Sequence, residues 1–83
     1  MYVKYITLSL GYYSVMTVGE NIKTLRKLNK MSQEQFAAAM GTTQQRISEW
    51  ECNKTEPSLY NVLKMLKVLG VTFEELTDGV DCE

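Results

Sequence analysis

Apolar and polar residues recur at helical spacing from about residue 16 onward, most clearly in residues 32–54, which read SQEQFAAAMGTTQQRISEWECNK. The first half of this stretch predicts a short helix with an apolar stripe of Phe36, Ala37 and Met40. Ser32 can cap its N-terminus, and Gln35, three residues later, completes a Ser-x-x-Gln capping box. Gly41 stands where a left-handed residue would end the helix.

A second helix is predicted directly after this turn. Thr43 can cap it, and Ile47 and Trp50, three residues apart, form its buried side. The other side is polar without being simply charged, and it consists of Gln44, Gln45, Ser48 and Glu49. A generic helical bundle explains the apolar side, but it gives no reason for two adjacent glutamines at an exposed helix start.

One further helix is expected before this pair, over residues 18–29. Its inward positions at helical spacing are Val18, Ile22, Leu25 and Leu28. Its basic side chains, Lys23, Lys27 and Lys30, would face solvent or phosphate.

Two more helices are expected after the pair. Pro57 and Ser58 start the longer one, and Gly70 ends it. Its predicted core stripe is Leu59, Val62, Leu63, Leu66 and Leu69. Thr72 and Glu75 form a capping box for a short last helix. In that helix we assign Phe73 to the core and leave Leu76 open between the core and a contact surface. The fold class predicted is all-α, a compact five-helix domain.

The first residues have a different pattern. Residues 1–10 alternate, with Tyr2, Ile6, Leu8 and Leu10 on one side, which favours a β-strand, and Gly11 could turn the chain into a second extended piece. An unpaired strand or hairpin is barely stable in water. We therefore divide the chain into a strand-like extension over residues 1–15, able to act as a dimerisation arm, a helical domain over 16–79, and an acidic tail over 80–83. An extension of little consequence is the alternative.

Composition narrows the function classes. The 83 residues are 45% hydrophobic with one Pro, which suits one small folded domain. No run approaches the roughly 18–20 apolar residues of a membrane span, and the start is a poor signal peptide, so we expect a cytoplasmic protein with no membrane contact. Without His, and with only Cys52 and Cys82, a zinc site lacks ligands. We expect Cys52 to be a packed, reduced thiol.

Catalytic patterns are also missing from the sequence. It contains no His base, no Gly-rich phosphate loop and no paired-carboxylate motif, which argues against an enzyme and against a cofactor. The net charge of −1 looks unfavourable for binding nucleic acid. However, residues 16–69 hold eight basic and five acidic side chains, whereas residues 70–83 hold five acidic and no basic ones. Steering depends on this local field rather than on the total charge.

Four segments, LRKLNKMSQEQFA, GTTQQRISEWE, NKTEPS and LGVTFEEL, occur in an order and spacing that resembles the phage repressor and Cro-like (Xre-type) helix-turn-helix DNA-binding proteins. The resemblance covers about residues 16–79. It implies a transcriptional regulator, most simply a repressor, that binds double-stranded DNA as a homodimer. The second helix of the motif would enter the major groove.

The resemblance also assigns roles to single residues. Gln44 and Gln45 would face the bases, where a carboxamide can pair with N6 and N7 of adenine, and Glu49 could accept from cytosine N4 or repel other bases. Contacts to the DNA backbone would come from Gln33, Arg46, Lys54 and Thr55.

The resemblance further implies a salt bridge between Arg26 and Glu51, for which the alternative is two exposed charges that contribute under about 1 kcal/mol. Cys52 stands where the family often has a polar residue, which puts one phosphate contact in doubt. Asn53 stands at a position often held by Gly, and Asn tolerates the left-handed turn needed there.

An antitoxin is the alternative function. Many antitoxins use this fold, and a terminal strand could add to the sheet of a toxin protein. A toxin-like reading frame beside the gene would discriminate between the two. The operator sequence, the spacing of its half-sites and the choice between repression and activation do not follow from the sequence.

Overall fold

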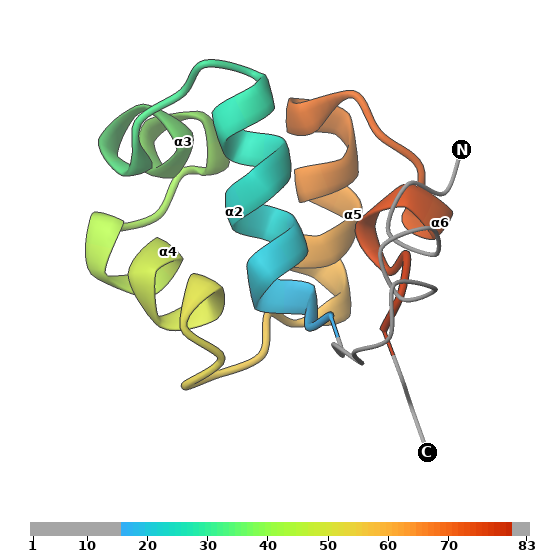
Figure 1. Cartoon of the computed structure of the whole chain (residues 1–83). Helices are drawn as coiled ribbons and strands as arrows, with labels where there is room; N and C mark the ends of the chain where they lie inside the picture. Colours follow the sequence, from blue (N-terminus) through green and yellow to red (C-terminus); the bar gives the residue numbers. More distant parts are fainter. Residues whose placement is uncertain (1–15, 81–83) are drawn as a thin grey trace.

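The computed structural model describes residues 16–80, and the predictions for residues 1–15 and 81–83 lie outside this part. Five helices follow one another in the described part, which confirms the all-α fold (Figure 1). They are α2 (Val18–Leu28), α3 (Gln33–Met40), α4 (Gln44–Glu51), α5 (Leu59–Leu69) and α6 (Phe73–Leu76).

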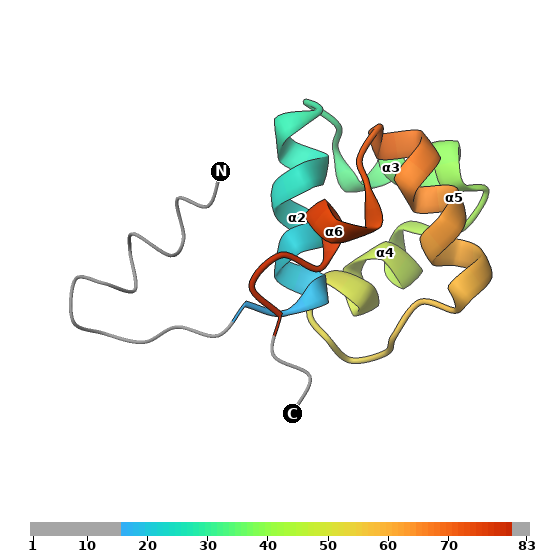
Figure 2. The ribbon, with the colours of Figure 1, turned by 90° about the vertical axis from the view of Figure 1, so that its right-hand side faces the viewer.

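Helix α2 runs through the middle of the domain, with α3 and α4 on one side and α5 and α6 on the other (Figure 1). It packs against α4 and α6, while α3 packs against α4 and α5. Turned by 90°, the view shows α6 lying beside α2, close to where the described chain begins and ends (Figure 2). The long helix α2 therefore carries the pair α3–α4 on one side and the C-terminal elements on the other.

Each helix starts at a hydroxyl residue in extended conformation that accepts a hydrogen bond from a backbone N–H in the first turn. These residues are Thr17, Ser32, Thr43, Ser58 and Thr72. The capping boxes predicted from Ser32 and Thr72 are confirmed, and Thr17 forms a third with Glu20. Gly41 and Gly70 end α3 and α5 in the left-handed region, at φ 71° and 69°. Because each cap contributes about 1 kcal/mol, the element boundaries are set locally.

The core predicted for α3 and α4 is confirmed, whereas that of α5 is partly wrong. Phe36, Ala37, Met40, Ile47 and Trp50 are all buried. In α5, Leu69 is buried, but Leu59 and Leu63 are 70% and 52% exposed, and the fully buried side chain is Met65. The apolar face of this helix is wider than the surface that its neighbours, chiefly α3, cover. Residues at one edge of the face therefore stay in solvent.

The core assignment of Phe73 is wrong, because its side chain is 56% exposed, and Leu76, left open by the sequence, is buried in the core. The two residues are three positions apart and share one side of the helix. This helix has only four residues, and the core covers its last residue but leaves its first in solvent. At the end of α2, Leu28, expected inward, is 71% exposed. Leu28 is the last residue of the helix, and its side chain stays in solvent, although Arg26 in the same turn is buried. Cys52, expected to be packed, is an exposed free thiol.

Side-chain amides join α2 to the C-terminal elements. Asn21 is buried, and its Nδ2 donates to the backbone oxygens of Leu76 at 2.8 Å and Asp78 at 3.0 Å. Val80, placed in the tail by the sequence pattern, forms an isolated parallel bridge with Met16. These contacts hold α6 on α2 without using its exposed phenylalanine.

Candidate nucleic-acid interface

Helix α4 has one buried and one accessible side. Ile47 and Trp50 enter the core, while the side chains of its first turn, Gln44, Gln45 and Arg46, are exposed. Thr43 Oγ1 accepts from Arg46 N at 3.1 Å. The backbone N–H groups of the first turn also point outward at the helix start, where the helix dipole is positive. This end of α4 can therefore offer donors to an anionic or base-edge partner.

One turn along α4, Gln45 and the half-buried Glu49 form a pair. Gln45 Nε2 donates to Glu49 Oε2 at 3.4 Å. This i, i+4 contact holds the carboxamide beside a carboxylate, so the two side chains share one patch of surface. The patch is rich in acceptor oxygens.

Gln33, at the start of α3, connects the accessible side of α4 to the interior. Its Oε1 accepts from Gln44 Nε2 at 3.4 Å, and its Nε2 donates to Glu51 Oε1 at 3.0 Å. Both amide heavy atoms of Gln33 thus have partners within the domain. The phosphate contact expected of Gln33 stays a prediction.

Arg26 and Glu51, named as a pair from the sequence, meet in two parallel hydrogen bonds. Arg26 Nε lies 2.6 Å from Glu51 Oε2, and Nη2 lies 3.1 Å from Oε1. The third guanidinium nitrogen, Nη1, donates to Met31 O at 2.8 Å. Both residues are 6% exposed, so the pair is buried and the alternative of two exposed charges does not apply. The bidentate geometry joins α2 to the end of α4.

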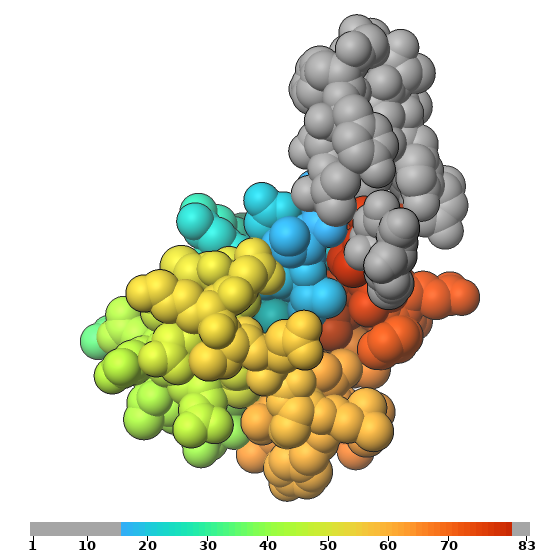
Figure 3. All heavy atoms as spheres, turned by 90° about the horizontal axis from the view of Figure 1, so that it is seen from below, coloured from blue at the N-terminus to red at the C-terminus, as the bar shows by residue number. Residues whose placement is uncertain are grey.

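The loop between α4 and α5 runs beside the first turn of α2 (Figure 3). It starts at Cys52, and Asn53 then turns left-handed with φ 61°, as the sequence predicts. The backbone N–H groups of Lys54 and Thr55 both donate to Glu49 O, at 2.9 and 3.4 Å, and their side chains are exposed. The side chains assigned to phosphate from α4 and from this loop therefore all reach solvent.

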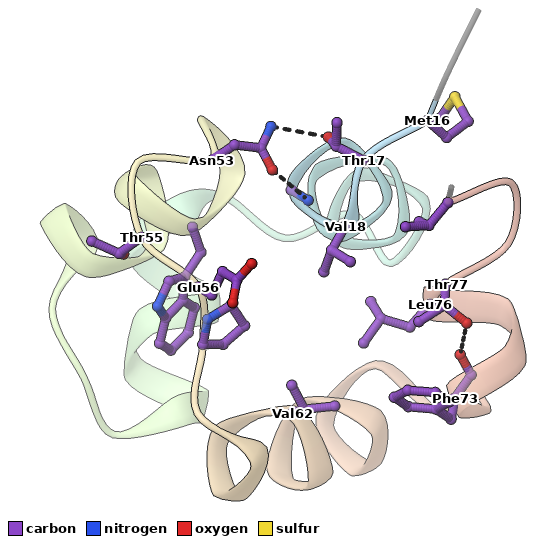
Figure 4. Close-up of a pocket in the computed structure, with 14 residues that line it drawn as sticks. Met16, Thr17, Val18, Asn53, Thr55, Glu56, Val62, Phe73, Leu76 and Thr77 are labelled. Carbon is purple, nitrogen blue, oxygen red and sulfur yellow. Dashed lines mark hydrogen bonds between the residues drawn. The ribbon is translucent and has the colours of Figure 1, made fainter. Parts of the chain in front are cut away.

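A cavity of about 470 Å³ lies behind this loop (Figure 4). Its walls come from the start of α2, the end of α4, the loop, α5 and α6, and they include Trp50, Pro57, Val62 and Phe73. No sequence pattern predicts this cavity, because its walls come from segments far apart in the chain. In residues 16–80, no group of three His, Cys, Asp or Glu could hold a metal ion. No helix of this part has the length and apolarity to cross a bilayer.

Comparison with known proteins identifies a matching family and several similar proteins. The model of the helix-turn-helix family matches residues 22–76. The SPbeta prophage-derived uncharacterized HTH-type transcriptional regulator YonR of Bacillus subtilis is 32% identical over 65 residues, 78% of this chain and 60% of its own. This chain thus spans less than two thirds of that relative. The uncharacterized HTH-type transcriptional regulator y4dJ of Sinorhizobium fredii is 31% identical over 64 residues, 77% of this chain and 83% of its own.

Among solved structures, the P22 c2 repressor, crystallised in complex with the synthetic operator 9T, superposes with a TM-score of 0.72 at 32% identity. The match covers 78% of this chain and 98% of that one. At this identity and coverage the likeness extends over the whole helical domain, including α3, α4 and the loop that follows.

Proposed function

The chain belongs to the phage repressor and Cro-like (Xre-type) helix-turn-helix family, and from this premise we propose that it is a sequence-specific regulator of transcription that binds double-stranded DNA. The observation that carries the proposal is the accessible first turn of α4, which presents Gln44 and Gln45 opposite a buried Ile47 and Trp50. The similarity to a repressor crystallised with its operator supports the same function. Such a role puts the protein where DNA is, in the cytoplasm.

In the proposed complex, α4 lies in the major groove with its N-terminal residues against base edges. Gln44 uses one amide hydrogen to bond Gln33, so its second amide hydrogen and its Oε1 remain available. The hydrogen can be donated to N7 and the oxygen can accept from N6 of one adenine. Gln45 and Glu49 together offer acceptor oxygens. They favour bases with an exocyclic amine, adenine or cytosine, because guanine presents only acceptors in this groove.

Contacts to the DNA backbone are assigned to Arg46, Lys54 and Thr55, with Gln33 as a fourth group if it leaves its partners in the domain. The first three have exposed side chains on or just after α4. Phosphate contacts set the register of the protein on the duplex, while the glutamines read sequence.

We also propose that the regulator acts as a homodimer. Two contact regions are candidates: the extension over residues 1–15, and the surface of α5 and α6 where Leu59, Leu63 and Phe73 are exposed. Large apolar side chains left in solvent are typical of interaction surfaces when they form one patch. Leu76 is buried and drops out of the second region. Neither the family nor the relatives favour the antitoxin alternative over a DNA-binding repressor.

Selection from a pool of random duplexes, at one stated salt concentration, tests this function. We expect enrichment of a two-fold symmetric site with half-site centres about one helical turn apart, near 34 Å. The matched control is the double variant Gln44→Ala/Gln45→Ala, which should keep non-specific binding and lose the enrichment. A wild-type protein that enriches no sequence would contradict the proposal.

A further inference from the structure

Asn53, the first left-handed residue after α4, uses both ends of its side-chain amide. Its Oδ1 accepts from Gly19 N at 3.2 Å, and its Nδ2 donates to Thr17 Oγ1 at 2.9 Å (Figure 4). The Gly19 N–H belongs to the first turn of α2, where backbone donors have no partner inside the helix. Asn53 therefore completes the N-terminus of α2 from a distant point in the chain.

The two segments approach so closely that they have little freedom to shift. A Cβ added to Gly19 would lie 2.4 Å from Trp50 O and 2.6 Å from Asn53 Oδ1. No side chain fits there, so the glycine lets the start of α2 rest directly on the end of α4. Asn53 sits at this junction and continues it into the loop.

Beyond the junction, the loop has little support from packing. Thr55, Glu56 and Pro57 line the cavity behind it. The side chains of Lys54, Thr55 and Glu56 are exposed. A backbone that lies over open space is held in place by polar contacts rather than by a packed core. Here these are the bonds of Lys54 N and Thr55 N to Glu49 O, which tie the loop to α4, and the side-chain bonds of Asn53, which tie it to α2.

We propose that Asn53 is a positioning residue for DNA-backbone binding, which fixes Lys54 and Thr55 by tying the start of their loop to α2. This inference rests on the proposed function, in which these two side chains bind phosphate. Asn53 itself touches no DNA in this scheme. Its loss lets the neighbouring ammonium of Lys54 move away from a phosphate, which weakens binding to every sequence equally.

The test measures affinity for one duplex over a series of salt concentrations. Asn53→Gly keeps a residue suited to the left-handed turn and removes only the side-chain bonds. We expect it to reduce the slope of log affinity against log salt by about one, the contribution of one phosphate contact. In a Lys54→Ala/Thr55→Ala background the same change should alter affinity by less than about twofold, because the groups it positions are already gone.

A second variant approaches the contact from the other side. Thr17→Val removes the acceptor of Asn53 Nδ2 and leaves the loop sequence intact, so it should lower the slope in the same direction by a smaller amount. It also removes the N-cap bond from Glu20 N, so Glu20→Ala, which weakens the same capping box and leaves the Asn53 bond in place, is its control and should keep the wild-type slope. Thermal unfolding of every variant checks that binding is measured on folded protein. Lys30→Gly is the control for the substitution itself, since Lys30 (φ 58°) is the other non-glycine residue with positive φ in residues 16–80.

The outcomes separate the two proposals. If the wild type binds no duplex, the proposed function fails and this inference fails with it. If the wild type binds DNA but Asn53→Gly leaves the salt slope unchanged, or if its effect multiplies with that of Lys54→Ala/Thr55→Ala, the positioning role alone is overturned.

Discussion

Replacing Arg26 with Ala removes one side of a buried ion pair. Glu51 would lose both hydrogen bonds from the guanidinium and keep only the one from Gln33 Nε2 at 3.0 Å. Met31 O would lose the donor that now lies 2.8 Å away. Since Glu51 is 6% exposed, its carboxylate cannot regain these partners from water without disturbing the end of α4.

The loss should be large for so small a domain. Breaking a buried pair by removing one partner costs about 3–5 kcal/mol, because the remaining charge is left without compensation. Domains of this kind have a total stability of about 5–15 kcal/mol. With a shift of about 4–8 °C for each kcal/mol, the melting temperature should fall by roughly 12–40 °C.

Urea unfolding followed by far-ultraviolet circular dichroism measures this free energy. Lys27→Ala is the matched control, since its side chain is the next on the same helix and is exposed. It should change stability by no more than about 0.5 kcal/mol. The double variant Arg26→Met/Glu51→Leu removes both charges, so it should recover much of the loss. Equal unfolding free energies for Arg26→Ala and Lys27→Ala, or a double variant no more stable than Arg26→Ala, would refute the reasoning.

Three further predictions concern binding and assembly. Gln44→Ala and Gln45→Ala should each cost about 1–3 kcal/mol on the preferred site and relax preference at one base pair, as measured by fluorescence anisotropy on single-substituted duplexes. An equal loss of affinity on all sequences would instead show that these side chains make no direct contact with bases. Lys54→Ala should weaken binding to all duplexes about equally and flatten the salt slope by about one, and a sequence-dependent loss would contradict a phosphate contact. Deleting residues 1–15 should convert the dimer to a monomer in light scattering if the extension is the arm. An unchanged mass would place the contact at the surface around Phe73 instead.

The helix ends of this fold were predictable because their signals are local. Ser32 with Gln35, and Thr72 with Glu75, satisfy backbone N–H groups within three residues, so no other part of the chain has to be known. The same signal was present in Thr17-Val-Gly-Glu20, where the third box forms. Its Thr-x-x-Glu spacing could have been used to fix the start of α2.

The edges of the apolar faces were not predictable in the same way. Periodicity gives the direction in which a helix is buried, but the width of the buried strip depends on how many neighbours cover it. In α5, Met65 lies at the centre of that strip and Leu59 and Leu63 lie beyond its edge. Met65 was missed because leucines on the adjacent ridge gave an equally regular stripe.

Contacts between side-chain amides and distant backbone groups have no sequence signature at all. Asn21 donates to two carbonyl oxygens more than fifty positions away, and Asn53 accepts from a glycine N–H 34 positions before it. Every residue offers the same backbone groups, so no pattern marks the partner. For this reason the candidate base contacts could be named from the sequence, whereas the residue proposed to hold the loop could not.

The buried ion pair has a consequence for reading DNA that its stability alone does not explain. An apolar pair of similar volume would support the fold about as well. Such a pair would lack the oxygen that accepts from Gln33 Nε2, and Gln33 Oε1 in turn accepts from Gln44 Nε2. The carboxylate of Glu51, fixed by Arg26 from α2, therefore orients Gln33 and through it the first side chain of α4. Substitutions at the pair should accordingly be judged by base preference as well as by unfolding, since a variant can keep its fold and still lose the orientation of Gln44.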